Sequence, residues 1–107
     1  MSPGRTERFE QGQVVVEDPD RDVQYTVWGI APVQALGTVL GRDLYFRARH
    51  NLWSFEIADH KGELPSDGRA EADGYYREAK YPDAGWMTGE VAMRIIERCL
   101  RDYLGVG

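Results

Sequence analysis

The chain has 107 residues, of which 42% are hydrophobic and 29% are charged. This is ordinary usage for one globular domain, and it argues against a disordered chain, a membrane-spanning chain or two domains. The 13 basic residues are outnumbered by 18 acidic ones, which gives a formal net charge of −5. A surplus of acid argues against general binding to a nucleic-acid backbone and favours a basic partner.

The N-terminal sequence predicts a flexible arm over residues 1–12, followed by a single α+β domain over residues 13–107. Small and charged residues surround Phe9 in the arm, which therefore has little to bury. This polar segment is neither a secretory signal nor a membrane anchor. One cysteine cannot form an internal disulfide. We therefore expect a cytoplasmic protein.

Two short strands are expected next. The β-branched run at residues 14–16 ends at an Asp-Pro-Asp turn. Residues 23–28 alternate with a period of two, which places Val23, Tyr25 and Val27 on one face. The second of these strands is therefore expected to turn that face toward a core.

Residues 33–58 predict two successive β-hairpins, the first turning at residues 41–42 and the second at residues 50–51. Both registers place the same apolar residues on one face, because a slip of one residue would bury arginine and expose phenylalanine. The expected pairs are Val39 with Leu44 and Gly37 with Phe46 in the first hairpin, and Leu44 with Ile57, Phe46 with Phe55 and Ala48 with Trp53 in the second. The shared inner face consists of Val33, Ala35, Gly37, Val39, Leu44, Phe46, Ala48, Trp53, Phe55 and Ile57.

The alternation is lost over residues 59–74, which predict a loop. Acidic residues recur there with helical spacing, but Gly62, Pro65 and Gly68 would interrupt a helix. An aromatic stretch follows, and a short strand is expected at residues 75–77 before the chain turns.

A C-terminal α-helix is the clearest element. Thr88 caps its N-terminus, a glycine ends it, and an apolar stripe runs along one side. Two pairs of opposite charge four residues apart, Glu90 with Arg94 and Glu97 with Arg101, are expected on its exposed side. The stripe consists of Val91, Ala92, Ile95, Ile96, Cys99, Leu100, Tyr103 and Leu104.

These elements predict an α+β fold, an antiparallel β-meander of about four to five strands with one C-terminal amphipathic α-helix packed on one face. The apolar stripe of the helix is expected to lie across the inner face of the sheet. The rings of Phe46, Trp53 and Phe55 then face the helix, and the arginines of the same strands face away.

No group of residues predicts catalysis or a bound cofactor. Asp59 and His60 are neighbours on an extended chain, so their side chains point apart, and the nearest hydroxyl, Ser66, lies in a loop. Two histidines and Cys99 are too few for a zinc site, and no glycine-rich phosphate loop is present. We therefore expect a protein that is not an enzyme, with no metal and no cofactor.

Arginines and a tyrosine line the outer face of the predicted sheet. Rings beside guanidinium groups bind single-stranded nucleic acid on some sheets. However, the run that contains Tyr45, Arg47 and Arg49 does not match the RNA-recognition motif, and the net charge opposes such binding. We expect no direct contact with nucleic acid or with a membrane.

Two surfaces are candidates for binding a protein partner. Aromatic residues anchor interfaces because they offer a large contact area with few rotatable bonds. Acidic clusters accelerate the encounter with a basic partner. The aromatic candidates are Tyr75, Tyr76, Tyr81 and Trp86, and the acidic candidates are Asp59, Glu63, Asp67, Glu71 and Asp73, with a further acidic turn at Glu17, Asp18, Asp20 and Asp22.

In size, acidity and layout the chain resembles the small inhibitors and immunity proteins of phages and mobile elements, including anti-CRISPR proteins. The resemblance rests on layout rather than on a motif, so it carries over no residue. It implies a non-enzymatic protein-binding module that occludes a basic, nucleic-acid-handling target. One alternative is a small-molecule-binding or enzymatic domain that uses Asp59 and His60 in a helix-sheet pocket. The other is a homodimeric structural protein that pairs through an exposed sheet edge or face.

Overall fold

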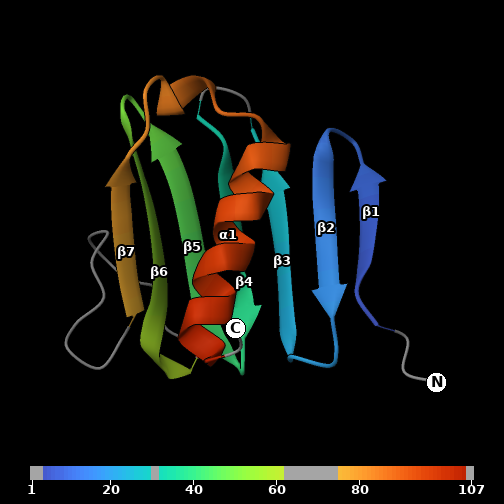
Figure 1. Cartoon of the computed structure of the whole chain (residues 1–107). Helices are drawn as coiled ribbons and strands as arrows, with labels where there is room; N and C mark the ends of the chain where they lie inside the picture. Colours follow the sequence, from blue (N-terminus) through green and yellow to red (C-terminus); the bar gives the residue numbers. More distant parts are fainter. Residues whose placement is uncertain (1–3, 30–31, 62–74, 106–107) are drawn as a thin grey trace.

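The computed structural model describes residues 4–29, 32–61 and 75–105, and for residues 59–61 the backbone alone. Within these residues the chain forms seven β-strands, one short 3₁₀ helix and one α-helix (Figure 1). The elements are β1 (Thr6–Glu10), β2 (Gln13–Asp18), β3 (Val23–Trp28), β4 (Gln34–Val39), β5 (Arg42–Arg49), β6 (Leu52–Lys61), β7 (Tyr75–Lys80), η1 (Ala84–Trp86) and α1 (Gly89–Leu104).

All seven strands lie in one antiparallel sheet whose spatial order follows the chain, from β1 at one edge to β7 at the other. The helix α1 crosses one face of this sheet, which we call the inner face (Figure 1). The predicted α+β class is confirmed, whereas the sheet has more strands than the four to five expected. The prediction gives too few strands because an exposed edge strand lacks the apolar alternation by which a strand is recognised in a sequence.

The strand β1 corrects the prediction of an arm over residues 1–12, because Thr6–Glu10 pairs with β2. Gln11 and Gly12 form the connecting turn with φ of 47° and 80°, the left-handed geometry that suits a tight hairpin. Every residue of β1 is exposed, so no buried face shows in its sequence. This part of the predicted arm therefore belongs to the sheet.

The two central hairpins test the predicted registers. The hairpin between β5 and β6 is confirmed, with Ala48 opposite Trp53 and Phe46 opposite Phe55. Its turn places His50 at a φ of 57°, a left-handed conformation that a polar residue tolerates better than a bulky apolar one.

The hairpin between β4 and β5 is shifted by two residues from its predicted register. Leu40 and Gly41 form its turn, with φ of 54° and 78°, because glycine suits the second central position of this turn type. Gly37 therefore lies opposite Leu44 rather than Phe46. Since side chains alternate with a period of two, a shift of two leaves every side chain on its predicted face.

The inner face carries the hydrophobic core, as predicted. Phe46 and Phe55 are fully buried, and the half-buried Trp53 stacks on Phe46 with ring centroids 6.2 Å apart. The expectation that these rings face α1 is therefore confirmed. The buried core consists of Val16, Val23, Tyr25, Val27, Val33, Ala35, Val39, Leu44, Phe46, Ala48, Phe55, Ile57, Ala84, Met87, Ala92, Ile96, Cys99 and Leu100.

Position 37 has no room for a side chain because β3 passes close to its main chain. A Cβ atom at this position would overlap the main chain of Gln24 and Tyr25. The expected pairing of Gly37 with Phe46 does not explain this glycine, because Phe46 lies opposite Ala35. Close packing of two strands therefore requires glycine here.

The helix α1 has the predicted ends. The Thr88 hydroxyl accepts a hydrogen bond from the Val91 N–H at 3.2 Å, which caps the N-terminus. Gly105 ends the helix with a φ of 75°. Glu90 and Arg94 form the expected exposed pair at 2.8 Å.

The second expected pair on the helix is wrong. Glu97 is only 6% exposed and faces the sheet instead of pairing with Arg101. It lies beside Ile96 and Leu100 on the helix surface, so it shares their direction toward the sheet.

One helix is too narrow to cover this sheet. Seven strands at about 4.8 Å spacing span roughly 29 Å, whereas a helix with its side chains is about 10 Å wide. The helix α1 lies over the middle strands, and β1 and β2 extend beyond it (Figure 1). A strip of the inner face beside α1 therefore stays open.

Replacing Gly37 with alanine is expected to lower the free energy of unfolding by about 1–3 kcal/mol, because the added methyl group forces β3 and β4 apart. Gly89→Ala at the start of α1 is the matched control, since a Cβ there would meet only Val27 Cγ1, at 3.7 Å. Urea unfolding followed by tryptophan fluorescence measures both variants. Equal stability of Gly37→Ala and the parent protein would contradict the close approach of the strands.

Candidate functional site

The four aromatic residues expected to anchor a partner do not form one patch. Tyr75 lies on the inner face, where its ring packs edge-on against Phe55 and Tyr103 with centroids 6.0 and 5.4 Å apart. Tyr76 lies on the outer face, and its hydroxyl donates a hydrogen bond to Glu78 at 2.9 Å. Neighbours on a strand point to opposite faces, which separates these two rings.

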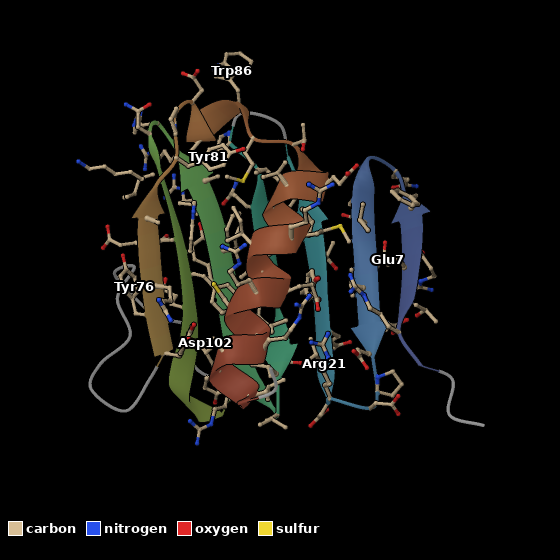
Figure 2. The ribbon with its side chains drawn as sticks, viewed as in Figure 1. Glu7, Arg21, Tyr76, Tyr81, Trp86 and Asp102 are labelled. Atoms are coloured by element: carbon tan, nitrogen blue, oxygen red, sulfur yellow. The ribbon has the colours of Figure 1, made fainter. Side chains whose placement is uncertain are left out.

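Tyr81 and Trp86 both lie toward the end of the sheet where η1 is located (Figure 2). Tyr81 is half-buried against the core, and its N–H donates a hydrogen bond to the Asn51 carbonyl oxygen at 2.9 Å. Trp86 is 75% exposed, and it is the one exposed ring among the four. It borders a hollow of about 520 Å³ that is also lined by Pro32, Arg47, Arg49, His50, Asn51, Asp83 and Gly85.

The expected acidic surface lies mostly outside the described residues. Glu63, Asp67, Glu71 and Asp73 fall between β6 and β7, where the chain is not described. Asp59 belongs to β6, but its side chain is also outside the described part. A role of these carboxylates in partner binding stays a prediction.

The seam between α1 and the sheet is filled by side chains. Phe46, Ile57, Ile96 and Leu100 have no accessible surface, which leaves no room for a ligand between them. The side chains of residues 59 and 60, the polar groups of the small-molecule alternative, lie outside the described part.

Neither a metal centre nor a reactive thiol is seen in the described chain. No group of three or more histidine, cysteine or carboxylate side chains there could hold a metal ion. Burial raises the pKa of the Cys99 thiol to about 11. The thiol is therefore protonated at neutral pH and a poor nucleophile.

The open strip beside α1 forms a groove between the helix and the strands β1 and β2, with a volume of about 780 Å³. We call it the β1–α1 groove. Glu7, labelled in Figure 2, marks its strand side. The groove is lined by Arg5, Glu7, Phe9 and Val14 from the sheet side, and by Gly89, Glu90, Met93, Arg94, Glu97, Arg98 and Arg101 from the helix.

The floor of the β1–α1 groove is apolar. Phe9 is 80% exposed, more than any other large apolar residue of the described chain. Val14 and Met93 are half-buried in the same groove and pack against the core. Contiguous exposed apolar surface with a polar rim is typical of an interaction site.

The rim of the groove carries charges, most of which are paired. Arg98 and Arg101 are the exceptions, because both are exposed and neither forms an ion pair within the described residues. Among the described residues, these two guanidinium groups of the rim have no carboxylate partner. The paired residues are Arg94 with Glu90 at 2.8 Å and Arg5 with Glu7 at 3.0 Å.

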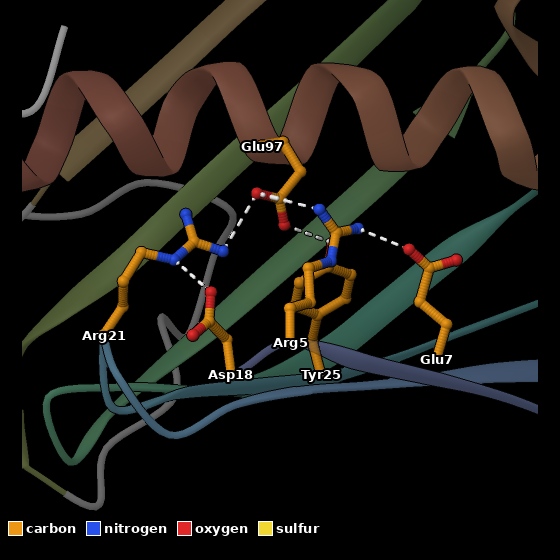
Figure 3. A network of polar contacts seen from close by, with 6 residues as sticks. All are labelled: Arg5, Glu7, Asp18, Arg21, Tyr25 and Glu97. Atoms are coloured by element: carbon orange, nitrogen blue, oxygen red, sulfur yellow. Dashed lines mark hydrogen bonds and ion pairs between the residues drawn. The ribbon is translucent and has the colours of Figure 1, made fainter. Parts of the chain in front are cut away.

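A buried carboxylate that lines the groove, Glu97, joins α1 to the sheet (Figure 3). The Tyr25 hydroxyl donates a hydrogen bond to Glu97 Oε2 at 2.7 Å, and Arg21 Nη2 donates one to Glu97 Oε1 at 2.9 Å. Arg5 Nη1 lies 3.5 Å from the same Oε1. Asp18 Oδ2 in turn holds Arg21 Nε at 2.6 Å.

This network stabilises a carboxylate that burial alone would penalise. An unpaired buried charge costs several kcal/mol, whereas Glu97 contacts two guanidinium groups and a hydroxyl. Burial, and then the charge of Glu97, raise the pKa of the Tyr25 hydroxyl above its ordinary value. The network therefore ties the chain before β1, the β2–β3 turn and β3 to the helix.

The opposite flank of α1 is closed by contacts with β7. Asp102 accepts hydrogen bonds from the Tyr75 hydroxyl at 2.9 Å and from Arg77 Nη2 at 2.6 Å. The Arg77 guanidinium, and then Tyr75, lower the pKa of the Asp102 carboxyl. Burial raises the pKa of Tyr75 to about 12. The helix is thus bridged to β7 on one side and borders an open groove on the other.

Sequence reasoning does not find the groove or the network, although each leaves a signal. Phe9 is the one large apolar residue within residues 2–13, which are otherwise small or polar. Glu97 interrupts an apolar stripe between Ile96 and Leu100, a position where a charge needs a partner from the sheet.

Comparisons of this chain with protein-family models, with curated proteins and with solved structures find no match. Within the described residues, no helix combines the length and the hydropathy of a membrane span. Function is therefore inferred from the groove and the residues around it.

Replacing Glu97 with alanine is expected to lower the free energy of unfolding by about 3 kcal/mol, because Arg21 and Tyr25 lose a partner in a mostly buried position. Glu90→Ala on the same helix is the matched control. Its exposed pair with Arg94 is expected to contribute at most about 0.5 kcal/mol. Urea unfolding compares the variants, and equal losses would contradict a stabilising role for the network.

Part of the stability of the fold is expected to be lost at alkaline pH because of Tyr25. The pKa of its hydroxyl is raised in the folded protein and is about 10 in the unfolded chain. Its contribution is therefore fully present below about pH 10 and is lost as the pH rises toward the folded value. Tyr25→Phe is expected to be less stable than the parent at about pH 8, with a smaller difference at about pH 11. Urea midpoints measure this, and a difference that stays constant or grows would contradict it.

Proposed function

We propose that this protein is a non-enzymatic protein-binding module that holds its partner in the β1–α1 groove. One observation carries the proposal: Phe9 is 80% exposed on an apolar floor that the helix of the fold leaves uncovered. Removal of such a ring from water by a partner lowers the free energy of the complex. The charged rim orients that partner.

The shape of the groove favours a protein segment over a small molecule. Small-molecule sites are concave cavities that enclose most of the ligand surface. The β1–α1 groove instead lies open between a strand and a helix flank, and charged side chains border it from Glu90 to Arg101. Such a surface resembles a protein–protein interface, which has an apolar centre and a polar rim.

The proposal includes the inhibitor or immunity-type role that the sequence led us to expect. An inhibitor or immunity-type protein of the cytoplasm is one form of such a module. Its single cysteine and net charge of −5 support that form, with acidic residues outside the β1–α1 groove meeting a target that is basic as a whole.

A homodimer paired through β1 is the second candidate function. The strand β1 lies at the edge of the sheet, and all of its residues are exposed. An unpaired edge presents backbone donors and acceptors to another strand. The charges of Glu7, Arg8 and Glu10 oppose this candidate, because charged side chains are a common protection of edge strands.

Phe9→Ser is expected to lower partner capture by roughly tenfold or more, because it removes the anchor of the groove floor. Leu36→Ser is the matched control, since Leu36 is 38% exposed on the outer face. The parent and both variants, each tagged, capture proteins from cells that express the chain naturally, and mass spectrometry quantifies what is bound. Urea midpoints confirm that the variants are folded.

A partner that Phe9→Ser captures as well as the parent does would contradict binding in the groove. A partner lost from Leu36→Ser but kept by Phe9→Ser would place the binding face on the other side of the sheet. Capture of an untagged copy of the chain itself, with no other protein, would favour the homodimer.

A further inference from the structure

We infer that the occupant of the β1–α1 groove is an acidic segment of a partner protein that carries one large apolar side chain. This inference rests on the proposed function and adds the chemistry of the partner. The apolar side chain lies against Phe9, and carboxylates of the segment bind Arg98 and Arg101.

The apolar side chain has a defined place in the groove. Phe9, Val14 and Met93 come from three different elements and border the same floor. Phe9 remains 80% exposed, so a leucine-sized or larger side chain placed on it removes apolar surface of both partners from water. Three floor residues offer room for one anchor rather than for a row of them.

We infer the charge of the partner segment from the charged side chains of the groove that are already in ion pairs. The glutamates of the groove all have cationic partners, so they do not require a basic ligand. Arg98 and Arg101 have no ion-pair partner within the described residues. The pairs are Glu7 with Arg5 at 3.0 Å, Glu90 with Arg94 at 2.8 Å and Glu97 with Arg21 at 2.9 Å.

The guanidinium groups of Arg98 and Arg101 match carboxylates in geometry as well as in charge. Arg98 and Arg101 are three residues apart on α1, so they are neighbours on the helix surface. The planar fork of a guanidinium binds a carboxylate through two parallel hydrogen bonds. Two carboxylates at a similar spacing on the segment therefore bind both arginines.

Other charged partners fit this groove less well. A nucleic-acid strand carries a charge at every nucleotide, so its phosphates would also lie along Glu7, Glu90 and Glu97, which line the same groove. A protein segment with two carboxylates places its charges at the two arginines alone. A basic segment would meet two arginines of its own sign of charge.

The net charge of −5 repels an acidic segment at long range, which suppresses acidic segments that lack the apolar anchor. Selectivity therefore comes from the anchor and the carboxylates together.

The test is a selection of random peptides displayed on phage, carried out on the immobilised full chain. Parallel selections use the double variant Arg98→Glu with Arg101→Glu, the Phe9→Ser variant, and Arg49→Glu as the matched control. Arg49 is an exposed arginine at the end of β5 and does not line the groove. Sequencing gives the enriched peptides, fluorescence anisotropy gives their affinities, and urea midpoints confirm that each variant is folded.

Peptides enriched on the parent are expected to combine aspartate or glutamate with one Phe, Leu, Ile or Trp. Their affinity is expected to fall roughly tenfold or more on the double arginine variant and on Phe9→Ser. On Arg49→Glu it is expected to stay within about twofold of the parent, because that charge lies outside the groove.

Neutral or basic peptides that need Phe9 but not the two arginines would overturn the inference and leave the proposed function standing. Peptides that bind Phe9→Ser as well as the parent would overturn both. Absence of enrichment on the parent over the double arginine variant would overturn the inference, as would a single-stranded oligonucleotide that binds through Arg98 and Arg101 more tightly than the best peptide.

Discussion

The packing of α1 across the inner face of the sheet determines where every other surface of the molecule lies. Ile96 and Leu100 of the helix are fully buried against the rings and aliphatic side chains of the middle strands. Because the helix has about a third of the width of the sheet, it must leave part of the inner face bare. Contacts of Asp102 with β7 close one flank, so the bare strip lies on the β1 side.

The buried carboxylate of Glu97 adds direction to this packing. Apolar contacts tolerate small rotations of a helix, whereas the contacts of Glu97 with Tyr25 and Arg21 fix one rotation. Residues three and four positions away lie on the same side of a helix, so Arg94 and Arg101 face the β1–α1 groove as a result. The group that stabilises the fold thereby also orients the charges of the candidate binding surface.

The sequence predicts the parts of this structure that depend on alternation. The inner-face pattern of residues 33–58 is strong because an error of one residue would bury arginine, and the β5–β6 register follows from it. The same logic cannot detect the shift by two at Leu40 and Gly41, since both registers bury the same residues. It also misses β1, which buries nothing, and Glu97, whose partners come from distant strands. Because the groove is formed in part by β1 and Glu97, the local sequence pattern does not predict it.

The order of elements along the chain has a consequence for biosynthesis. Hairpins between consecutive strands close soon after they leave the ribosome, but the helix that covers them follows all seven. At roughly 5–20 residues per second, the face that carries Phe46 and Phe55 waits for seconds without its cover, in contact with chaperones and other nascent chains. A premature stop codon within α1 would therefore yield an aggregation-prone sheet rather than a slightly smaller domain.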